Sequence, residues 1–525
     1  MTNPSPSSIQ SRRWALGWAL VLLLLSCLPY LIALFAAPEG WHFAGFLVNP
    51  LDGHSYLAKM QQGAAGNWLF HLTYTPETHQ GAFIFVFYLA LGHLARLTGL
   101  PLIVMFHLAR LTTGFFLLMT TWRFIRRVSP HPAEQRLAFV LLLSASGLGW
   151  LGAMLGAFPI DLWIPEAFVP YSLYTNPHFP LGMALMLIIF EQIVWPRPEQ
   201  PGLAWRPLLE VGLPGVALAL VLPFALVTVV VVLALYVAGV YRSQHRLPWS
   251  QIRPTLVVAF FVISILLYDY WVSTSQPIFA GWSAQNVTPS PALSDLVWGY
   301  GLVGLLAVVG AGLVWRSRSE GEQLILLWVV ATLLLVYAPF DLQRRFITGL
   351  HLPLCLLAAI GWHRWRASQS LPDRWRRLFV TGLVTLGAVG TLFVWLVPLL
   401  SLSQAPGLSE TNARLFVRTE EQIAFDWLRE NTSSETVILA GPRLGMFLPG
   451  QTGARVFYGH PFETIAAAQK EATVRAFYRG EVEPPVVVDL IIYGPDEQSI
   501  GQPKNLNRYS VVFATEPIAV YEVKK

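Results

Sequence analysis

Residues 14–36 read WALGWALVLLLLSCLPYLIALFA and contain no charged side chain. Because about 20 apolar residues let a helix cross a bilayer, this run predicts a first membrane-spanning helix. Arg12 and Arg13 precede it directly, and basic residues stay on the cytoplasmic side. They predict a cytoplasmic N-terminus and a helix that runs outward. The run is too long for the core of a signal peptide and no small-residue cleavage site follows it, so we expect an uncleaved anchor.

The composition indicates that membrane-spanning helices make up most of the chain. Of the 525 residues, 54% are hydrophobic and only 12% are charged, whereas soluble domains carry roughly 25% charged residues. We therefore predict a mainly α fold, a polytopic transmembrane bundle of 11 to 13 helices. Pro223 divides one long run into two short helices, and residues 82–97 form either an extra crossing or a re-entrant or surface-lying helix. The other apolar runs lie near 101–122, 137–156, 181–195, 208–222, 223–240, 254–270, 297–314, 322–340, 346–363 and 378–400.

Basic clusters mark the expected cytoplasmic turns. The last of them, between Arg364 and Arg377, makes the final helix run outward and places residues 403–525 outside the cytoplasm. Residues 401–525 carry 12 Lys and Arg against 15 Asp and Glu, so the basic excess belongs to the membrane part. This distribution of basic residues follows the positive-inside rule, and no nucleic-acid partner is expected. Cys27 and Cys355 both lie in apolar runs, which argues against a disulfide framework or a zinc site.

The tail has an α/β pattern. Strands are expected at 437–440, 455–458, 486–493 and 509–523, with helices at 420–430 and 463–478. This alternation predicts a small, partly parallel sheet. The segments 441–445 (GPRLG) and 459–464 (GHPFET) match no phosphate-binding fingerprint; we interpret them as a strand-to-helix turn and a helix start. The expected domains are a membrane module, residues 1–402, with outward loops at 37–80 and 157–180, and an extracytoplasmic domain, residues 403–525.

The stretch 49–59, NPLDGHSYLAK, places several reactive groups where the chain leaves the bilayer. Asp52 is the candidate catalytic group, although Asp is also a favoured helix N-cap, and both roles stay open. His54 and Tyr56 are candidates for substrate binding or for packing and orientation. Lys59 is two helical turns after Asp52 and either meets a phosphate or extends to lipid headgroups.

A divalent metal site is a further possibility in this loop, because carboxylates and imidazoles are suitable ligands. Its ligands would come from Asp52, His54, His71, Glu77 and His79. Their spacing matches no standard pattern, so no cofactor is assigned.

Two further stretches are candidates for substrate binding. Residues 158–180, FPIDLWIPEAFVPYSLYTNPHFP, contain Glu166 and, between two prolines, His178, whose imidazole could bind a sugar or a phosphate. An aromatic belt at the membrane interface is the alternative for this segment. Arg344 and Arg345 form an arginine pair on the side where cations are depleted. Paired guanidinium groups suit a phosphate, and a salt bridge to Asp341 or contact with headgroups is the alternative.

The layout resembles the GT-C glycosyltransferases, particularly those related to protein mannosyltransferases and aminoarabinose transferases. The resemblance rests on the acid and aromatic of the first outward loop (Asp52 and Tyr56), the segments 92–96 (GHLAR) and 109–110 (AR), the late outward segment 343–346 (QRRF) with Pro353 after it, and the extracytoplasmic tail. The family often has paired acids where this chain has Asp52-Gly53.

The resemblance implies transfer of a sugar, with inversion, from a polyprenyl-phosphate-linked donor to a lipid, glycan or protein acceptor outside the cytoplasm. Asp52 would be the general base, and Arg344 and Arg345 would hold the phosphate. The donor's tail would lie among the helices of a multi-pass protein in the cell membrane, in contact with lipids. Two alternatives remain: a transporter or flippase for a lipid-linked saccharide, and a non-catalytic envelope-assembly protein whose tail binds a partner.

Overall fold

The computed structural model describes residues 6–196, 206–339, 341–369, 372–400, 402 and 413–523. The chain divides into two compact units. Unit 1 comprises Met1–Leu28, Ala109–Leu267 and Thr288–Val397, and unit 2 comprises Pro29–Leu108, Tyr268–Val287 and Pro398–Lys525. The first loop and the tail therefore belong to the same unit.

Unit 1 is helical. Its elements are α1 (Pro6–Phe35), α4 (Leu102–Val128), α5 (Pro132–Ser144), α6 (Gly149–Met154), η1 (Ile160–Leu162), η2 (Pro165–Ala167), α7 (Val169–Thr175), α8 (His178–Val194), α9 (Arg206–Val221), α10 (Pro223–Gln244), α11 (Trp249–Ser275), α13 (Leu293–Val314), α14 (Glu320–Val336), η3 (Gln343–Ile347), α15 (His351–Ala367) and α16 (Asp373–Leu400). Helices α1, α4, α11 and α16 each continue into unit 2. Pro223 begins α10 as its first residue, where its missing N–H costs nothing, so the predicted division of the long run is confirmed.

The apolar helices identify a multi-pass membrane protein. Within the described residues, seven helices are long and apolar enough to cross a membrane: Ile9–Phe35, Leu102–Val128, Pro132–Met154, Pro223–Gln244, Trp249–Ser275, Leu293–Val314 and Asp373–Leu400. On α11, Leu256, Phe260, Ile263 and Leu267 are each more than half exposed, an apolar face suited to lipid. Shorter apolar helices are Val86–Thr98, His178–Val194 and Leu209–Val221, and the total number of crossings stays a prediction.

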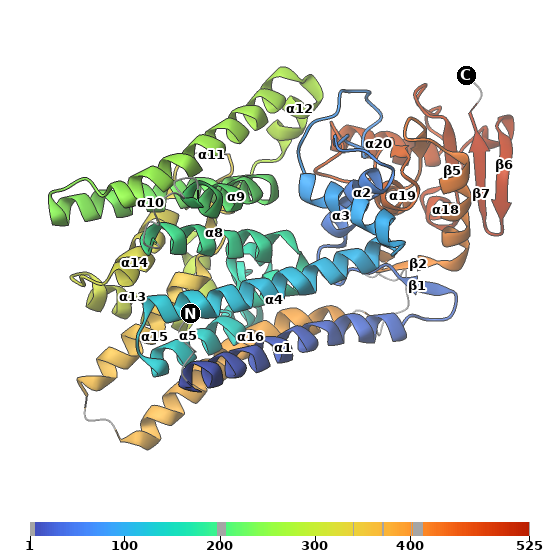
Figure 1. Ribbon diagram of the computed structural model, residues 1–525. Coiled ribbons are helices and arrows are strands. Elements are labelled where there is room, and N and C mark those ends of the chain that lie inside the picture. The colour runs from blue at the N-terminus through green and yellow to red at the C-terminus, as the bar shows by residue number, and fades with distance from the viewer. Residues whose placement is uncertain are drawn as a thin grey trace. The chain divides into compact units, whose positions relative to one another are not determined.

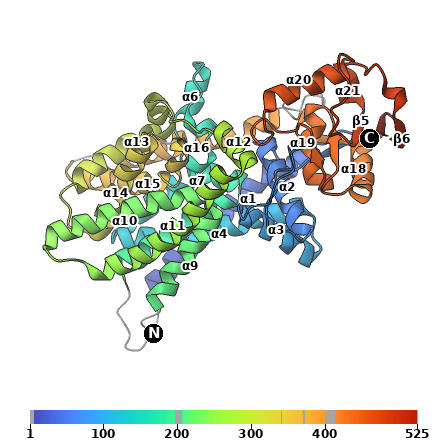
Figure 2. The same ribbon diagram turned by 90° about the horizontal axis from the view of Figure 1, so that it is seen from above.

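Close helix packing in unit 1 depends on glycine. Helices α13, α14 and α15 pack on one another (Figure 2). A Cβ atom at Gly310 would lie 2.0 Å from the carbonyl oxygen of Leu357, and one at Gly361 would lie 2.7 Å from the nitrogen of Gly310. Small residues let membrane helices approach closely enough for backbone contact, which is how α13 and α15 meet.

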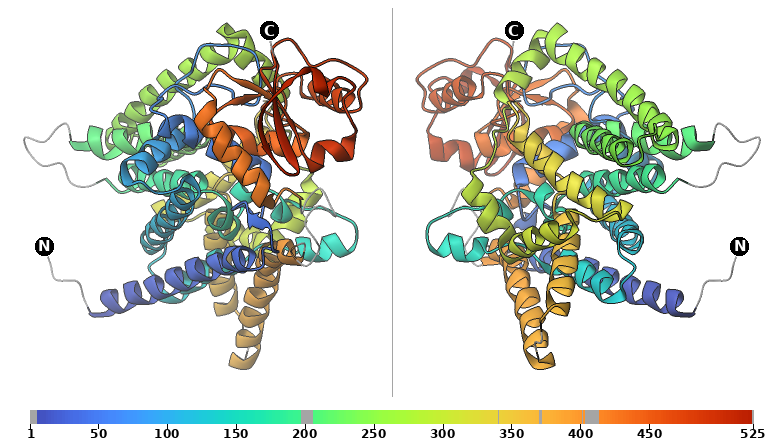
Figure 3. Two further views of the ribbon diagram at one scale, coloured as in Figure 1. Left: turned by 90° about the vertical axis from the view of Figure 1, so that its right-hand side faces the viewer. Right: turned by 90° about the vertical axis from the view of Figure 1, so that its left-hand side faces the viewer.

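Unit 2 contains the sheet of the tail, coloured orange to red in Figure 3. The five strands run in the order β4-β3-β5-β7-β6. They are β3 (Val437–Leu439), β4 (Arg455–Val456), β5 (Leu490–Tyr493), β6 (Ser510–Thr515) and β7 (Ile518–Glu522). β3 is parallel to β4 and β5, and the other pairs are antiparallel, so the partly parallel sheet is confirmed. The single strand predicted at 509–523 was wrong: a turn at Glu516-Pro517 divides it into a hairpin, because Pro cannot donate to a central ladder.

Helices surround this sheet. They are α18 (Thr419–Asn431), α19 (Pro442–Thr452), α20 (Ala467–Tyr478), α21 (Pro495–Ile500) and the short η5 (Leu506–Arg508). The predicted helix 420–430 matches α18 closely. The predicted helix 463–478 begins later, at Ala467, because the segment 459–464 is a turn.

The first loop joins the tail through paired strands and a shared core. β1 (Trp41–Phe43) pairs antiparallel with β2 (Phe416–Arg418). Helices α2 (Pro50–Ala64), α3 (Val86–Thr98) and α12 (Pro277–Gln285) complete the unit, and α2 packs on both α3 and α19 (Figure 1). Buried Ala58 and Tyr74 share one cluster with Phe447 of the tail. The predicted boundary at 402/403 stays a prediction, but the tail's core includes side chains from the first loop.

Helices α2 and α3 are in backbone contact. A Cβ atom at Gly92 would lie 1.9 Å from the carbonyl oxygen of Met60, and one at Gly63 would lie 2.0 Å from that of Leu89. α3 has 13 residues and spans only about 20 Å, which is short for a crossing. This favours the surface-lying or re-entrant alternative for residues 82–97.

Candidate functional site

Asp52 lies in the first turn of α2. The helix begins at Pro50 and its N-cap is Asn49, so the interpretation of Asp52 as the N-cap itself was wrong. A carboxylate in the first turn is still favoured by the helix dipole. The Asp52 side chain is 47% exposed, so it combines a fixed backbone with access to a substrate.

His460, in the turn between β4 and α20, faces Asp52. Its Nε2 atom is 3.9 Å from Oδ1 of Asp52, and its side chain is 2% exposed. Nδ1 accepts hydrogen bonds from the backbone N–H groups of Phe462 at 3.1 Å and Glu463 at 3.2 Å. Nδ1 is thus unprotonated, and the ring proton is on Nε2. Burial lowers the pKa of His460, although the Glu463 and Asp52 charges oppose this. A neutral imidazole therefore directs its N–H toward Asp52.

Glu463 links this turn to α2. Lys59 Nζ lies 2.7 Å from Glu463 Oε1 and 2.5 Å from Ser55 Oγ, and Ser55 Oγ also donates to Glu463. Burial disfavours the ionised carboxylate, but the Lys59 charge and these hydrogen bonds outweigh it and lower the pKa of Glu463. Lys59 is 1% exposed and is further enclosed by the Phe85 ring, whose centre is 4.5 Å from Nζ. The Lys59 ammonium group is therefore enclosed in the interior of unit 2 and does not extend to its surface.

Further hydrogen bonds fix the turn. Thr464 Oγ1 donates to the carbonyl of Tyr74 at 2.8 Å and accepts the N–H of His460 at 3.3 Å. The Tyr74 hydroxyl donates to the carbonyl of Met446 at 2.9 Å, and burial raises the pKa of this fully enclosed phenol. The first loop and the tail hold His460 from both sides.

His54 and Tyr56 lie among aromatic rings. The His54 ring is completely buried, with ring centres 4.5 Å from Phe447 and 5.2 Å from Phe46. Neither of its nitrogens has a hydrogen-bond partner, and burial, with the Arg443 charge, lowers its pKa to about 3. Tyr56 stacks on Tyr88 at 4.3 Å. The surroundings of His54 and of Tyr56 therefore favour a role in packing and orientation over substrate binding.

Among the possible metal ligands of the first loop, His71 and His79 lie near each other, with ring centres 5.6 Å apart. Lys470 Nζ pairs with Glu77 Oε1 at 2.5 Å, and His79 Nε2 accepts the N–H of Leu72. His54 is fully buried between the Phe46 and Phe447 rings. Among the residues that the structure describes, no group of three or more His, Cys, Asp or Glu side chains could hold a metal ion.

Glu166 and His178 lie inside unit 1. The predicted loop 157–180 forms the short helices η1, η2 and α7, and its residues from Pro165 to Pro180 are buried. Glu166 is 3% and His178 7% exposed, and the His178 ring lies 4.0 Å from that of Phe179. From Pro165 onward the segment is therefore interior, whereas Phe158 at its start is 65% exposed.

Arg344 and Arg345 lie on η3 in unit 1. The Arg344 guanidinium is 4.9 Å from the centre of the Trp163 ring, and that of Arg345 is 5.4 Å from the centre of the Phe224 ring. The two cations thus lie over different aromatic rings. A guanidinium group can stack on an aromatic face and also bind carboxylate or phosphate through its planar fork.

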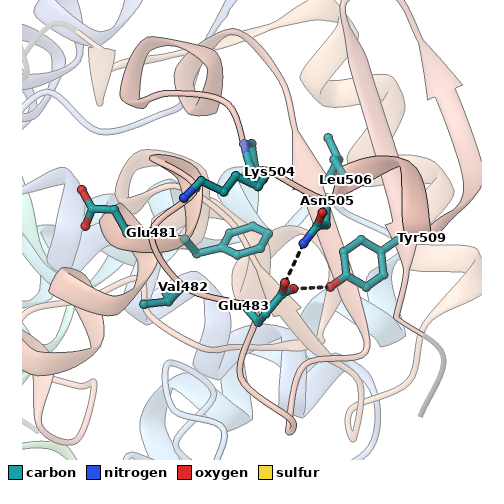
Figure 4. Close-up of a pocket in the computed structure, with 10 residues that line it drawn as sticks. Glu481, Val482, Glu483, Lys504, Asn505, Leu506 and Tyr509 are labelled. Carbon is teal, nitrogen blue, oxygen red and sulfur yellow. Dashed lines mark hydrogen bonds between the residues drawn. The ribbon is translucent and has the colours of Figure 1, made fainter.

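One pocket of about 120 Å³ lies in the tail (Figure 4). Glu483 accepts hydrogen bonds there from Asn505 and Tyr509. Ligand sites usually measure roughly 300–1,000 Å³, so this pocket is too small for a lipid-linked sugar headgroup.

Sequence reasoning missed His460 and Glu463 as site residues. The segment 459–464 was interpreted only as a helix start, and its contacts with α2 join residues about 400 positions apart. The local signal was limited to two titratable residues, His460 and Glu463, in a Gly- and Pro-containing turn.

Comparison with known proteins identifies similar structures. No family model and no curated protein matches the sequence. ArnT from Cupriavidus metallidurans bound to undecaprenyl phosphate aligns with 14% identity and a TM-score of 0.50, over 96% of this chain and 98% of that one. Its apo state aligns over 96% and 97%, with the same identity and TM-score. The oligosaccharyltransferase of Archaeoglobus fulgidus, tethered with an acceptor peptide, aligns with 13% identity and a TM-score of 0.47, over 91% of this chain and 69% of that one.

Proposed function

The chain has the GT-C fold, and from this premise we propose that it is a membrane glycosyltransferase that uses a polyprenyl-phosphate-linked sugar donor. The observation that carries the proposal is Asp52, a half-exposed carboxylate on a rigid helix beside an otherwise buried charge network. Such a carboxylate suits a general base that must meet an incoming acceptor.

In the proposed reaction, Asp52 takes the proton from the acceptor nucleophile as that atom attacks the anomeric carbon. The bond from the anomeric carbon to the phosphate oxygen breaks, and the lipid phosphate leaves with the electron pair. Arg344 and Arg345 stabilise the negative charge that develops on this leaving group. Proton transfer by a positioned carboxylate contributes about 10²–10⁴ in rate.

The lipid donor is proposed by analogy with the ArnT structure, which binds undecaprenyl phosphate. The apolar faces of the helices offer surfaces for such a chain. The acceptor is a lipid, glycan or protein on the outer side of the membrane, if the predicted topology holds. Asp52 and the tail would then face that side.

The test is sugar transfer in proteoliposomes, with a panel of radiolabelled undecaprenyl-phosphate hexoses and pentoses and a membrane extract as acceptor. Asp52→Asn should lower kcat by about 10²–10⁴, because the amide cannot take the proton. Asp295→Asn is the matched control, since Asp295 is another first-turn acid, on α13, and it should transfer at the wild-type rate. Sugar transfer at the wild-type rate by Asp52→Asn would show that Asp52 is not the general base.

A further inference from the structure

His460 is a buried polar group aimed at Asp52 without a hydrogen-bond partner for its Nε2 atom. A buried N–H that is left unpaired costs about 1–3 kcal/mol, so its persistence calls for a function. The Nδ1 side of the ring is occupied by two backbone N–H groups. The ring therefore cannot turn over without losing both bonds, and its Nε2–H stays directed at the carboxylate.

We propose that His460 is a positioning residue for Asp52: its Nε2–H holds one carboxylate oxygen and leaves the other for the acceptor. This inference rests on the proposed function and extends it to a residue of the tail. The 3.9 Å separation exceeds a hydrogen bond by about 1 Å. A small rotation of the half-exposed Asp52 side chain closes it, as catalytic contacts commonly tighten when substrate binds.

The same geometry excludes a proton relay. Nε2 already carries the ring proton, and Nδ1 is blocked by the N–H groups of Phe462 and Glu463. His460 can therefore accept no proton from Asp52 without breaking the turn. The proton that Asp52 takes from the acceptor must leave to solvent through the exposed side of the carboxylate.

Other charged groups also interact near His460. Lys59 and Glu463 form an ion pair with each other, and Arg414 acts electrostatically on the His460 ring. On the α3 side, Tyr88 interacts electrostatically with Asp52. Of these groups, His460 places a ring nitrogen 3.9 Å from the Asp52 carboxylate.

The test compares His460→Gln with His460→Met, which are similar in size. Both lose the Nδ1 atom that accepts the two backbone N–H groups, but only the Gln amide can donate to Asp52. We expect His460→Met to lower kcat about tenfold with little change in the KM for the undecaprenyl-phosphate sugar, and His460→Gln to restore most of it. Equal activity of the two variants would overturn the proposal and reduce His460 to a structural role.

A second measurement needs no donor. Carbodiimide reacts with protonated carboxyl groups, so the labelling of Asp52 at pH 6, quantified by mass spectrometry, reports how well the carboxylate is stabilised. His460→Met should raise this labelling about threefold, whereas His460→Gln and the wild type should match. Asp426, an exposed acid of α18, is the internal control. Equal labelling in all three proteins would overturn the positioning role, whereas transfer by Asp52→Asn would overturn only the proposed function.

Discussion

Lys59 and Glu463 lie 404 positions apart in the sequence, and their Nζ and Oε1 atoms are 2.7 Å apart in a buried ion pair. Their side chains are 1% and 12% exposed. The pair joins α2, which carries Asp52, to the turn that carries His460. It is therefore one of the contacts that hold the geometry of the candidate site, together with the hydrogen bonds of Thr464.

Removing one partner of this pair should be costly. Lys59→Met leaves the Glu463 carboxylate buried without its cation, which typically costs about 3–5 kcal/mol. Thermal unfolding in lipid nanodiscs should show a clear loss of stability, and the double variant Lys59→Met/Glu463→Leu should recover much of it. Arg429→Met is the control, because the Arg429–Asp426 pair is exposed and is worth about 0–1 kcal/mol. Equal effects of Lys59→Met and Arg429→Met would contradict the structural role of the buried pair.

The contact between α2 and α3 should not tolerate a methyl group. Gly92→Ala places a Cβ atom against the Met60 carbonyl, so α3 must move away from α2, at a cost of about 1–3 kcal/mol. The same unfolding assay measures the loss. Gly382→Ala is the control, because a Cβ there meets nothing within 4 Å. If Gly92→Ala is as stable as Gly382→Ala, the close approach of the two helices is incorrect.

The buried His54 predicts a pH dependence of stability. Its pKa in the folded protein is about 3, below the ordinary value of about 6.5, so the unfolded state binds the extra proton in this range. The contribution of His54 to stability is fully present above pH 6.5 and is lost as the pH decreases toward 3. At pH 5 the loss from His54 is about 2 kcal/mol.

The measurement is the melting temperature between pH 7.5 and 5, a range above the titration of most carboxyl groups. His54→Leu should flatten the decline, whereas His42→Leu, at an exposed position, should keep the wild-type slope. An unchanged slope in His54→Leu would show that His54 does not titrate as a buried group.

The arginine pair predicts a change in lipid binding. Arg344→Ala and Arg345→Ala should each weaken binding of undecaprenyl phosphate about 10- to 100-fold, because a hydrogen bond to a charged group contributes about 1.5–3 kcal/mol. Lys at either position should restore binding only in part, since it lacks the planar fork. Arg318→Ala, in the turn before α14, should bind like the wild type. Unchanged affinity in both Ala variants would leave the pair with a stacking role on Trp163 and Phe224.

The sequence predicted the features that local patterns encode. Uninterrupted apolar runs located the membrane helices, Pro223 located a helix boundary, and the period of residues 420–430 located α18. Gly441-Pro442 was interpreted as a strand-to-helix turn, and Pro442 does begin α19. These features depend on neighbouring residues, which is why they can be inferred without a structure.

The remaining features depend on partners that are distant in the chain. β1 has only three residues, Trp41–Phe43, and its partner β2 lies beyond residue 400. Lys59 was predicted to meet a phosphate or to extend to lipid headgroups, because its partner Glu463 gives no local signal. His460 could not be assigned to Asp52 for the same reason: the two meet only once the tail has folded.

The shared core of the first loop and the tail also constrains how the protein is made. Lys59 leaves the ribosome 404 residues before Glu463, which at about 5–20 residues per second is a wait of tens of seconds. During that time Ala58 and Tyr74 lack the partners that later enclose them. A chain that terminates early keeps its anchors and its aspartate but never acquires the histidine that faces it, so the last quarter of translation decides whether a usable molecule results.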